Sequence, residues 1–381
     1  MSPTVTGRAE TPSLAQVLAA RRIPGMDALR LLGVLSVMMS HAGLLDWSFG
    51  LQMLLVVSGF LITRMLLQEH DRTGTVHVSR FAWQRATRLM PAMLAYTALG
   101  AAYLMARGIP LPFGAIASAL AQVLNYHQAL TGGQTHYLSH TWSLSLQEQF
   151  YVLWPLFLLW AWRRGMRLHR AIAGYILGVW AVRAFECLVM SAPDPYLYRA
   201  LETRSDNLAV GGLIAVLLRD PRWSEGYQRL RRMGPAILAV TAILLGVSEL
   251  HRGDPTYRYV IGMALEPLLI ALAMPFMFLW ASTPSWPRRL LNARVVVAAG
   301  QGSYAMYLWQ QILMSGCIHA LTRHHWAPWP AFGVAATLIA LVGHLSFTYF
   351  ESPARRALTA RTAHWFQPPQ ADAQSSQSRM A

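Results

Sequence analysis

Long apolar runs alternate with short polar segments along most of this 381-residue chain. An α-helix needs roughly 20 apolar residues to cross the hydrocarbon core of a bilayer, and many of the runs approach that length. We therefore predict an all-α fold, a polytopic integral membrane bundle of about ten transmembrane helices. The predicted spans cover residues 26–46, 51–67, 89–106, 142–162, 171–190, 207–218, 235–250, 260–280, 302–321 and 330–349.

The polar segments between the runs are of two kinds. The chain contains no lysine, and its arginines gather in alternate segments. Such segments lie on the cytoplasmic side under the positive-inside rule, so both chain termini are expected there. Residues 1–22 are then a cytoplasmic tail, residues 23–353 a membrane domain, and residues 354–381 a second cytoplasmic tail. The second tail is expected to be largely disordered because its end is rich in Gln, Ser and Pro.

The composition agrees with burial in lipid. Charged residues make up 13% of the chain, about half of what a soluble protein carries. The net charge of +15 would suit a nucleic-acid partner, but the arginines are spread between spans and form no single basic face, so no nucleic-acid partner is expected.

Cys187 and Cys317 lie in apolar stretches without metal-ligand spacing, so neither a metal nor thiol chemistry is expected. The polar residues before the first run are too many for a cleavable signal peptide.

The first apolar run carries two ionisable side chains, Arg30 and His41. They are eleven residues apart, which places them on the same helix face and about 16 Å apart along the axis. Such groups are costly in lipid unless they face protein or a wet cavity. His41 could be hydrogen-bonded to a neighbouring helix, or it could be a general base. Asp46 could orient the His41 ring, although a surface position is favoured.

Arg80, Arg85 and Arg88 precede the third span on its predicted cytoplasmic side. Arg85 and Arg88 share one helix face because they are three residues apart. These arginines could simply anchor the helix at the inner leaflet. Alternatively, they could bind a phosphorylated donor, because the guanidinium fork matches phosphate geometry.

Other polar groups also fall within or beside the spans. Glu148 lies inside the fourth apolar run, where an ionisable group must pair or line a cavity. Arg204 and Asp206 precede the sixth run and are expected to form an ion pair. A solute transporter would explain buried polar residues equally well, so that class stays open as an alternative.

The segment from residue 109 to 141 is the largest one predicted to lie outside the membrane. It contains no basic residue except histidine, and proline and glycine pairs are expected to break regular structure there. It holds His127, His136 and His140, together with two tyrosines. Such side chains suit hydrogen bonding to sugar hydroxyls.

Seven segments of the chain, in this order and on the predicted spans, resemble the integral-membrane acyltransferase-3 family, which includes O-antigen and exopolysaccharide O-acetyltransferases. The resemblance covers the chain from about Ile23 to Arg356. The segments are DALRLLGVLSVMMSH (27–41), VVSGFLITRMLL (56–67), FAWQRATRLMPA (81–92), TWSLSLQEQFYVLWP (141–155), RSDNLAVGGLIA (204–215), SYAMYLWQQ (303–311) and YFESPARR (349–356).

The resemblance implies transfer of an acyl group from cytoplasmic acetyl-CoA, or another acyl-CoA, to a hydroxyl at the outer face of a bacterial inner membrane. The implied acceptor is a carbohydrate or glycolipid, with a metabolite such as a macrolide as the alternative. By the same resemblance Arg30 and His41 are an essential pair with His41 as catalytic base. Arg85 and Arg88 help to hold the donor, and Glu148 is an active-site or structural acid.

The chain departs from the family pattern at two positions. Gln147 stands where the family usually has an acidic residue, and Gln310 stands where it often has a histidine. Neither position therefore inherits the role of the family residue. The chain ends soon after the last predicted span, so the soluble esterase-like domain fused to some relatives is expected to be absent.

Overall fold

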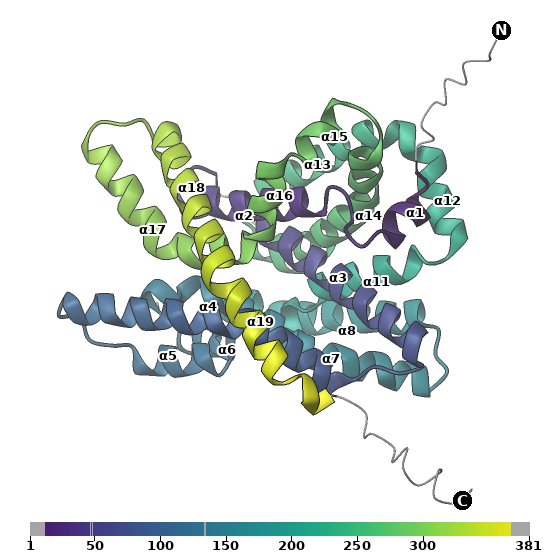
Figure 1. Ribbon diagram of the computed structural model, residues 1–381, viewed down its shortest axis with the longest axis horizontal. Helices are drawn as coiled ribbons and strands as arrows, with labels where there is room; N and C mark the ends of the chain where they lie inside the picture. Colours follow the sequence, from purple (N-terminus) through teal and green to yellow (C-terminus); the bar gives the residue numbers. More distant parts are fainter. Residues whose placement is uncertain (1–11, 46, 48, 133–134, 367–381) are drawn as a thin grey trace, which may run out of the picture.

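The computed structural model describes residues 12–45, 47, 49–132 and 135–366 (Figure 1). Over these residues the chain is helical and has no strand, which confirms the all-α fold class. The first half consists of α1 (Leu14–Ala19), α2 (Met26–His41), α3 (Phe49–Thr73), α4 (Val78–Ala106), α5 (Phe113–Leu120), α6 (Leu124–Thr131), η1 (His136–Thr141), α7 (Trp142–Arg163) and α8 (Leu168–Leu188).

The second half begins with three short or medium helices and ends with a long hairpin. Its elements are α9 (Asp194–Arg199), α10 (Leu201–Arg204), α11 (Asp206–Leu217), α12 (Pro221–Leu230), η2 (Arg231–Met233), α13 (Gly234–Leu250), η3 (Tyr257–Gly262), α14 (Met263–Ser282), α15 (Trp286–Leu291), α16 (Arg294–Gln301), α17 (Ser303–Arg323), α18 (Pro328–Leu345), η4 (Ser346–Glu351), α19 (Ser352–Arg361) and η5 (Ala363–Phe366). The placement of residues 1–22 and 354–381 in the cytoplasm stays a prediction.

Six helical segments of the described chain are long and apolar enough to cross a membrane, so the predicted count of about ten is not confirmed. They are Phe49–Thr73, Val78–Ala106, Leu168–Leu188, Pro221–Leu250, Tyr257–Ser282 and Pro328–Arg361. The other four predicted spans are missing from this set for two physical reasons: two helices are short, and two carry polar side chains. α2 and α11 have 16 and 12 residues, while α7 and α17 carry polar side chains such as Glu148 and Gln310.

The centre of the bundle is built on α3, which packs closely against α11 and α2. Glycine permits the closest approach: a Cβ on Gly59 would lie 1.8 Å from the Leu208 carbonyl oxygen, and a Cβ on Gly211 2.0 Å from that of Val56. Small residues let two helix backbones meet in this way. Figure 1 shows α2 and α3 near the middle, the α17–α18 hairpin at one side and α19 crossing α4.

A buried ion pair joins α8 to α11, and it is not the predicted one. Asp206 accepts from the Nη1 atom of Arg183 at 2.8 Å, and both side chains are buried. Arg204 instead stacks on the ring of Tyr198, 4.7 Å from its centroid. The predicted Arg204–Asp206 pair is therefore wrong, because residues two apart leave a helical turn in different directions.

The segment from residue 109 to 141 is more regular than predicted. It forms α5, α6 and η1, and tyrosine hydroxyls attach it to the bundle. Tyr126 donates to Glu202 at 2.6 Å, and Tyr137 donates to the carbonyl of Thr97 at 3.0 Å. These bonds hold η1 so that His140 is buried against α7 and α17 instead of facing solvent.

Candidate active site

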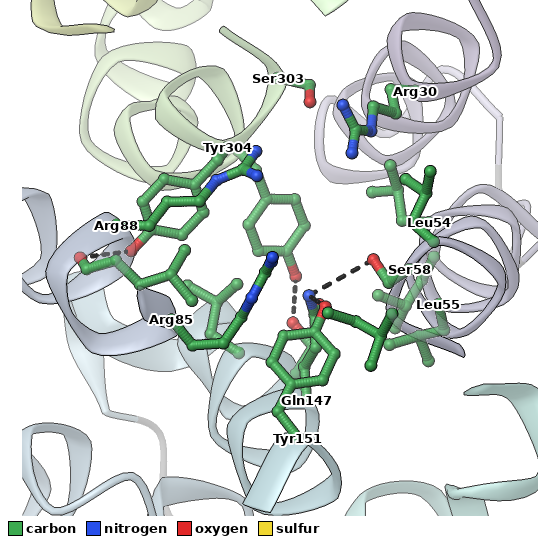
Figure 2. A pocket seen from close by; sticks show the side chains of 17 residues that line it. Arg30, Leu54, Leu55, Ser58, Arg85, Arg88, Gln147, Tyr151, Ser303 and Tyr304 are labelled. Carbon is green, nitrogen blue, oxygen red and sulfur yellow. Dashed lines mark hydrogen bonds between the residues drawn. The ribbon is translucent and has the colours of Figure 1, made fainter. Parts of the chain in front are cut away.

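A cavity of about 100 Å³ lies among α2, α3, α4, α7 and α17. Three guanidinium groups line it, those of Arg30, Arg85 and Arg88, and we term it the arginine cavity. Figure 2 shows Arg30 on one side of the open space and the other two arginines on the opposite side, with all three pointing inward. Its other polar lining residues are Ser58, Ser143, Gln147, Tyr151, Ser303, Tyr304 and Tyr307.

The positive charge of the arginine cavity is only partly balanced. Arg30 lies 3.7 Å from Asp27, whose carboxylate is already held by the Nε atom of Arg22 at 2.8 Å. Within the part of the chain that the structure describes, no carboxylate lies within 4 Å of the Arg85 or Arg88 guanidinium. A buried cation without a close partner favours binding an anion. The cavity is thus suited to a negatively charged or strongly polar ligand.

Two glutamates act on these arginines from a greater distance. Glu148 interacts electrostatically with Arg85 and Arg88, but it does not line the cavity, and its Oε1 atom has no hydrogen bond. Glu351 interacts with Arg88 and accepts a hydrogen bond from Ser346 at 2.8 Å. Glu351 was not predicted as a site residue, although an acid at the end of an apolar run was a usable signal.

Arg80 is not brought into the arginine cavity with Arg85 and Arg88. It lines a separate groove of about 300 Å³ between α3 and α4, together with Arg72. The two spaces adjoin at Met65, which lines the groove and whose sulfur lies 3.3 Å from the Nη2 atom of Arg85. A groove with two arginines and one glutamate, Glu69, therefore lies next to the arginine cavity.

Gln147, one of the two positions at which the chain departs from the pattern of the family it resembles, lines the arginine cavity. Its amide donates to Ser58 at 3.3 Å and also contacts the hydroxyl of Tyr151 (Figure 2). A neutral amide adds no negative charge. The substitution therefore leaves the arginines of this chain less compensated than an acidic residue here would.

A second cavity, of about 390 Å³, contains His41 at the end of α2 and His140 of η1, and we term it the histidine cavity. Its lining also includes aromatic and polar side chains, among them Trp47, Trp142, Tyr198, Arg199, Gln310 and Gln311. None of its described lining residues is acidic. Asp46, the candidate carboxylate for orienting His41, lies outside the described residues.

Two residues beside His41 were not predicted as site residues. Gln310 is fully buried and its side-chain amide faces the imidazole of His41. His140 is buried, and its ring nitrogens have no hydrogen-bond partner among the residues that the structure describes. Burial, followed by the proximity of His41, lowers the pKa of His140 to about 3, so its ring is neutral near pH 7. The signals were present in the sequence as a histidine just before α7 and paired glutamines within an apolar run.

The two cavities meet at Leu51 and Tyr307, which line both of them. The Tyr307 hydroxyl lies 2.6 Å from the Ser143 hydroxyl and donates to the carbonyl of His140 at 3.1 Å. Arg30 and His41 thus face two adjoining spaces along one side of α2, in agreement with their helical spacing.

These features define a helical membrane protein with a basic cavity and a histidine-bearing cavity that share a wall. Residues 23–348 match the acyltransferase-3 family, described as an acyltransferase domain. The chain belongs to this family, which confirms the resemblance seen in the sequence.

Several relatives carry acetyltransferase names. A Staphylococcus aureus (strain COL) protein, named provisionally as an O-acetyltransferase, is 26% identical over 91% of this chain and 59% of its own length. The peptidoglycan O-acetyltransferase OatA of Listeria monocytogenes is 25% identical over 88% of this chain and 56% of its own. The O-acetyltransferase OatA of S. aureus is 25% identical over 90% and 59%. The chain thus spans less than two thirds of these relatives, and no solved structure matches it.

Proposed function

We propose that this chain is a membrane O-acyltransferase that moves an acetyl group from acetyl-CoA to a hydroxyl of a carbohydrate or glycolipid. The observation that carries the proposal is the shared wall between the two cavities. Three arginines lie on one side of the wall and His41 lies on the other. An anionic thioester and a neutral hydroxyl compound can therefore each occupy a chemically suitable space and meet at Leu51 and Tyr307.

The arginine cavity is the donor site in this proposal. Its volume of about 100 Å³ suits the narrow arm and thioester of the donor rather than a nucleotide. The phosphates would stay at its mouth, where Arg85 and Arg88 supply charge-assisted hydrogen bonds. Arg80 and Arg72 in the adjoining groove give further positive charge. Arg30 would hold the polar end of the arm, and Glu148 would keep the two α4 arginines oriented.

His41 would act as the general base for the acceptor. Its imidazole lies in the histidine cavity, where a hydroxyl could place its proton within reach. The neighbouring Gln310 amide makes no hydrogen bond among the described residues, and by turning toward the ring it would take the place of a carboxylate partner and fix the ring tautomer. The neutral His140 cannot supply a competing positive charge near pH 7.

The acceptor site follows from the remaining lining of the histidine cavity. Trp47, Trp142 and Tyr198 offer aromatic surfaces, and Arg199 and Gln311 offer hydrogen-bond donors. This mixture suits the alternating apolar and hydroxyl faces of a sugar. The name of the Listeria relative, a peptidoglycan O-acetyltransferase, supports a glycan of the cell envelope. A smaller hydroxylated metabolite such as a macrolide is the alternative acceptor.

The expected location is the inner membrane of a bacterium, with several spans and both termini in the cytoplasm. The arginine-rich segments between alternate apolar runs support this orientation. It places the arginine cavity toward the cytoplasm, where acyl-CoA is available, and the histidine cavity toward the outer face.

Isotope transfer tests the proposed function directly. Purified full-length protein would be supplied with acetyl-CoA labelled in the acetyl group and with envelope glycan from a strain lacking the chain. We expect label to appear in the glycan as an alkali-labile ester, and mass spectrometry of the strain's envelope to show loss of the same ester. Uptake of a solute without acetyl transfer would instead identify a transporter.

A further inference from the structure

We propose that Tyr307 is a catalytic residue whose hydroxyl stabilises the oxyanion formed on the thioester carbonyl, with Ser143 freeing it to do so. This inference rests on the proposed acetyl transfer and adds a residue to it. Acyl transfer requires a hydrogen-bond donor at the position where the carbonyl oxygen becomes negative. The family resemblance supplied no such donor.

Tyr307 lies between the two cavities, where the reacting carbon is expected. The carbonyl carbon of the thioester is bonded to the donor's sulfur, which lies in the arginine cavity. The acceptor oxygen that attacks this carbon comes from the histidine cavity. The reacting carbon therefore belongs at the wall between the arginine and histidine cavities. Leu51 and Tyr307 form that wall. Because Leu51 is apolar, the Tyr307 hydroxyl is the donor that the wall itself provides.

The hydrogen bonds around Tyr307 allow its hydroxyl to turn toward the oxyanion. Two hydroxyls compete for one acceptor: the Tyr307 and Ser143 hydroxyls each lie 3.1 Å from the His140 carbonyl oxygen and can each donate to it. The two hydroxyls are also hydrogen-bonded to each other at 2.6 Å, with either as donor, so one hydrogen at a time points to the carbonyl. If Tyr307 turns its hydrogen to another oxygen, Ser143 still satisfies the carbonyl. Releasing Tyr307 therefore leaves no buried acceptor unpaired, which would otherwise oppose the change.

The surroundings make this hydroxyl effective. The Tyr307 side chain is buried, so a hydrogen bond from it to a developing charge is stronger than one at a surface. The ring of Tyr307 also packs against that of His140, with centroids 5.3 Å apart. This contact limits movement of the ring, so the hydroxyl is held at the wall before the reaction begins.

The acceptor oxygen forms a bond to the thioester carbon as His41 takes the hydroxyl proton, and the carbonyl π electrons move onto oxygen. Tyr307 donates its hydrogen bond to that oxyanion. When the carbonyl reforms, the carbon–sulfur bond breaks and the sulfur takes the proton from His41. The products are the acetyl ester and the free thiol of CoA.

Steady-state kinetics of three variants of the full chain test the inference. The assay uses labelled acetyl-CoA and envelope glycan from the deletion strain, with equilibrium binding of acetyl-CoA measured in parallel. For Tyr307→Phe we expect kcat to fall by about 100- to 1,000-fold, the usual effect of losing an oxyanion donor. The KM and binding of acetyl-CoA should stay near the wild-type values.

The Ser143→Ala variant tests the second hydroxyl. Without Ser143 the His140 carbonyl retains only Tyr307 as its donor, so Tyr307 is held away from the oxyanion. We expect a kcat loss of about tenfold, comparable to one ordinary hydrogen bond. If Tyr307→Phe does not fold, Ser143→Ala still tests the inference. A lower kcat at unchanged KM supports it, and an unchanged kcat contradicts it.

Tyr96→Phe is the matched control. Tyr96 is also buried and donates to a backbone carbonyl, that of Tyr137 at 2.6 Å, but it lines neither cavity. Its loss should lower thermal stability without lowering kcat. If wild-type protein transfers acetyl and His41→Ala does not, yet Tyr307→Phe keeps its kcat, the Tyr307 inference is wrong and the proposed function stands. If wild-type protein transfers no acetyl, the proposed function itself fails.

Discussion

The arginine cavity and the histidine cavity differ in charge although they share two wall residues. Among the described residues, the first holds three guanidinium groups and has no close carboxylate at Arg85 or Arg88. The second is larger, and its described lining consists of aromatic rings, amides, two histidines and one arginine, Arg199, besides small and apolar side chains. One space is suited to an anion and the other to a neutral polar molecule. In the proposed function, donor binding and proton transfer are therefore divided between the two sides of one wall.

This division has a physical reason. Strong positive charge stabilises a phosphorylated donor, but the same charge would oppose protonation of an imidazole nearby. Separating Arg30 from His41 by eleven residues along α2 keeps the base away from the cationic cluster. Both side chains still lie on one helix, so their separation is fixed by helical geometry.

The largest expected effect comes from removing the base. His41→Gln should lower acetyl transfer by about 10²- to 10⁴-fold, the usual contribution of a general base. Binding of acetyl-CoA should be unchanged, because His41 lies in the histidine cavity. His127→Gln, on α6 and outside both cavities, is the control and should retain activity. Near-normal transfer by purified His41→Gln protein would rule out the base assignment.

The arginines should produce the opposite pattern. Arg85→Gln and Arg88→Gln should each raise the KM for acetyl-CoA by about 10- to 100-fold, since each removes a charge-assisted hydrogen bond. The exposed Arg80, in the adjoining groove, should matter less, with Arg80→Gln raising KM by less than about fivefold. Titration calorimetry with acetyl-CoA gives the same ranking independently. Equal effects at all three positions would contradict this ranking, because they would mean that the groove contributes as much to donor binding as the cavity.

A smaller effect is expected at Gln310. Replacement by Leu removes the amide beside His41, whose polar atoms make no hydrogen bond among the described residues, and should lower kcat by at most about tenfold, the effect of the one hydrogen bond it would form to the ring. Gln310→His restores a polar partner and should recover most of the loss. The KM for acetyl-CoA should not change in either variant. A change in KM with constant kcat would place Gln310 in donor binding instead.

The smallest effect concerns pH. The pKa of His140 is lowered to about 3 by burial and by His41, so His140 is already neutral at pH 5 and stays neutral as the pH rises to 8. It therefore contributes no ionisation in this range. In His140→Gln protein the midpoint of the acid limb of the pH–rate profile should not move. A shifted midpoint would show that His140 takes part in the proton transfer.

The sequence was sufficient for features that depend on one helix. The spacing of Arg30 and His41, and that of Arg85 and Arg88, fixes which face each pair occupies. Features that join distant segments were beyond it. The Ser143–Tyr307 contact joins residues 164 positions apart, and the pairing of Asp206 with Arg183 depends on how α8 packs against α11. Hydropathy also predicted more spans than the described helices support, because α2 and α11 are short and α7 and α17 bury polar side chains against protein.

The most direct test of the central claim is a transfer assay across a sealed vesicle. Protein would be reconstituted in one orientation, with labelled acetyl-CoA supplied only at the face of the arginine cavity and deletion-strain envelope glycan only at the face of the histidine cavity. The account predicts labelled glycan ester in intact vesicles, and none when the two substrates exchange sides. Transfer that occurs only when both substrates are on the same side would contradict a wall with donor and acceptor on opposite faces.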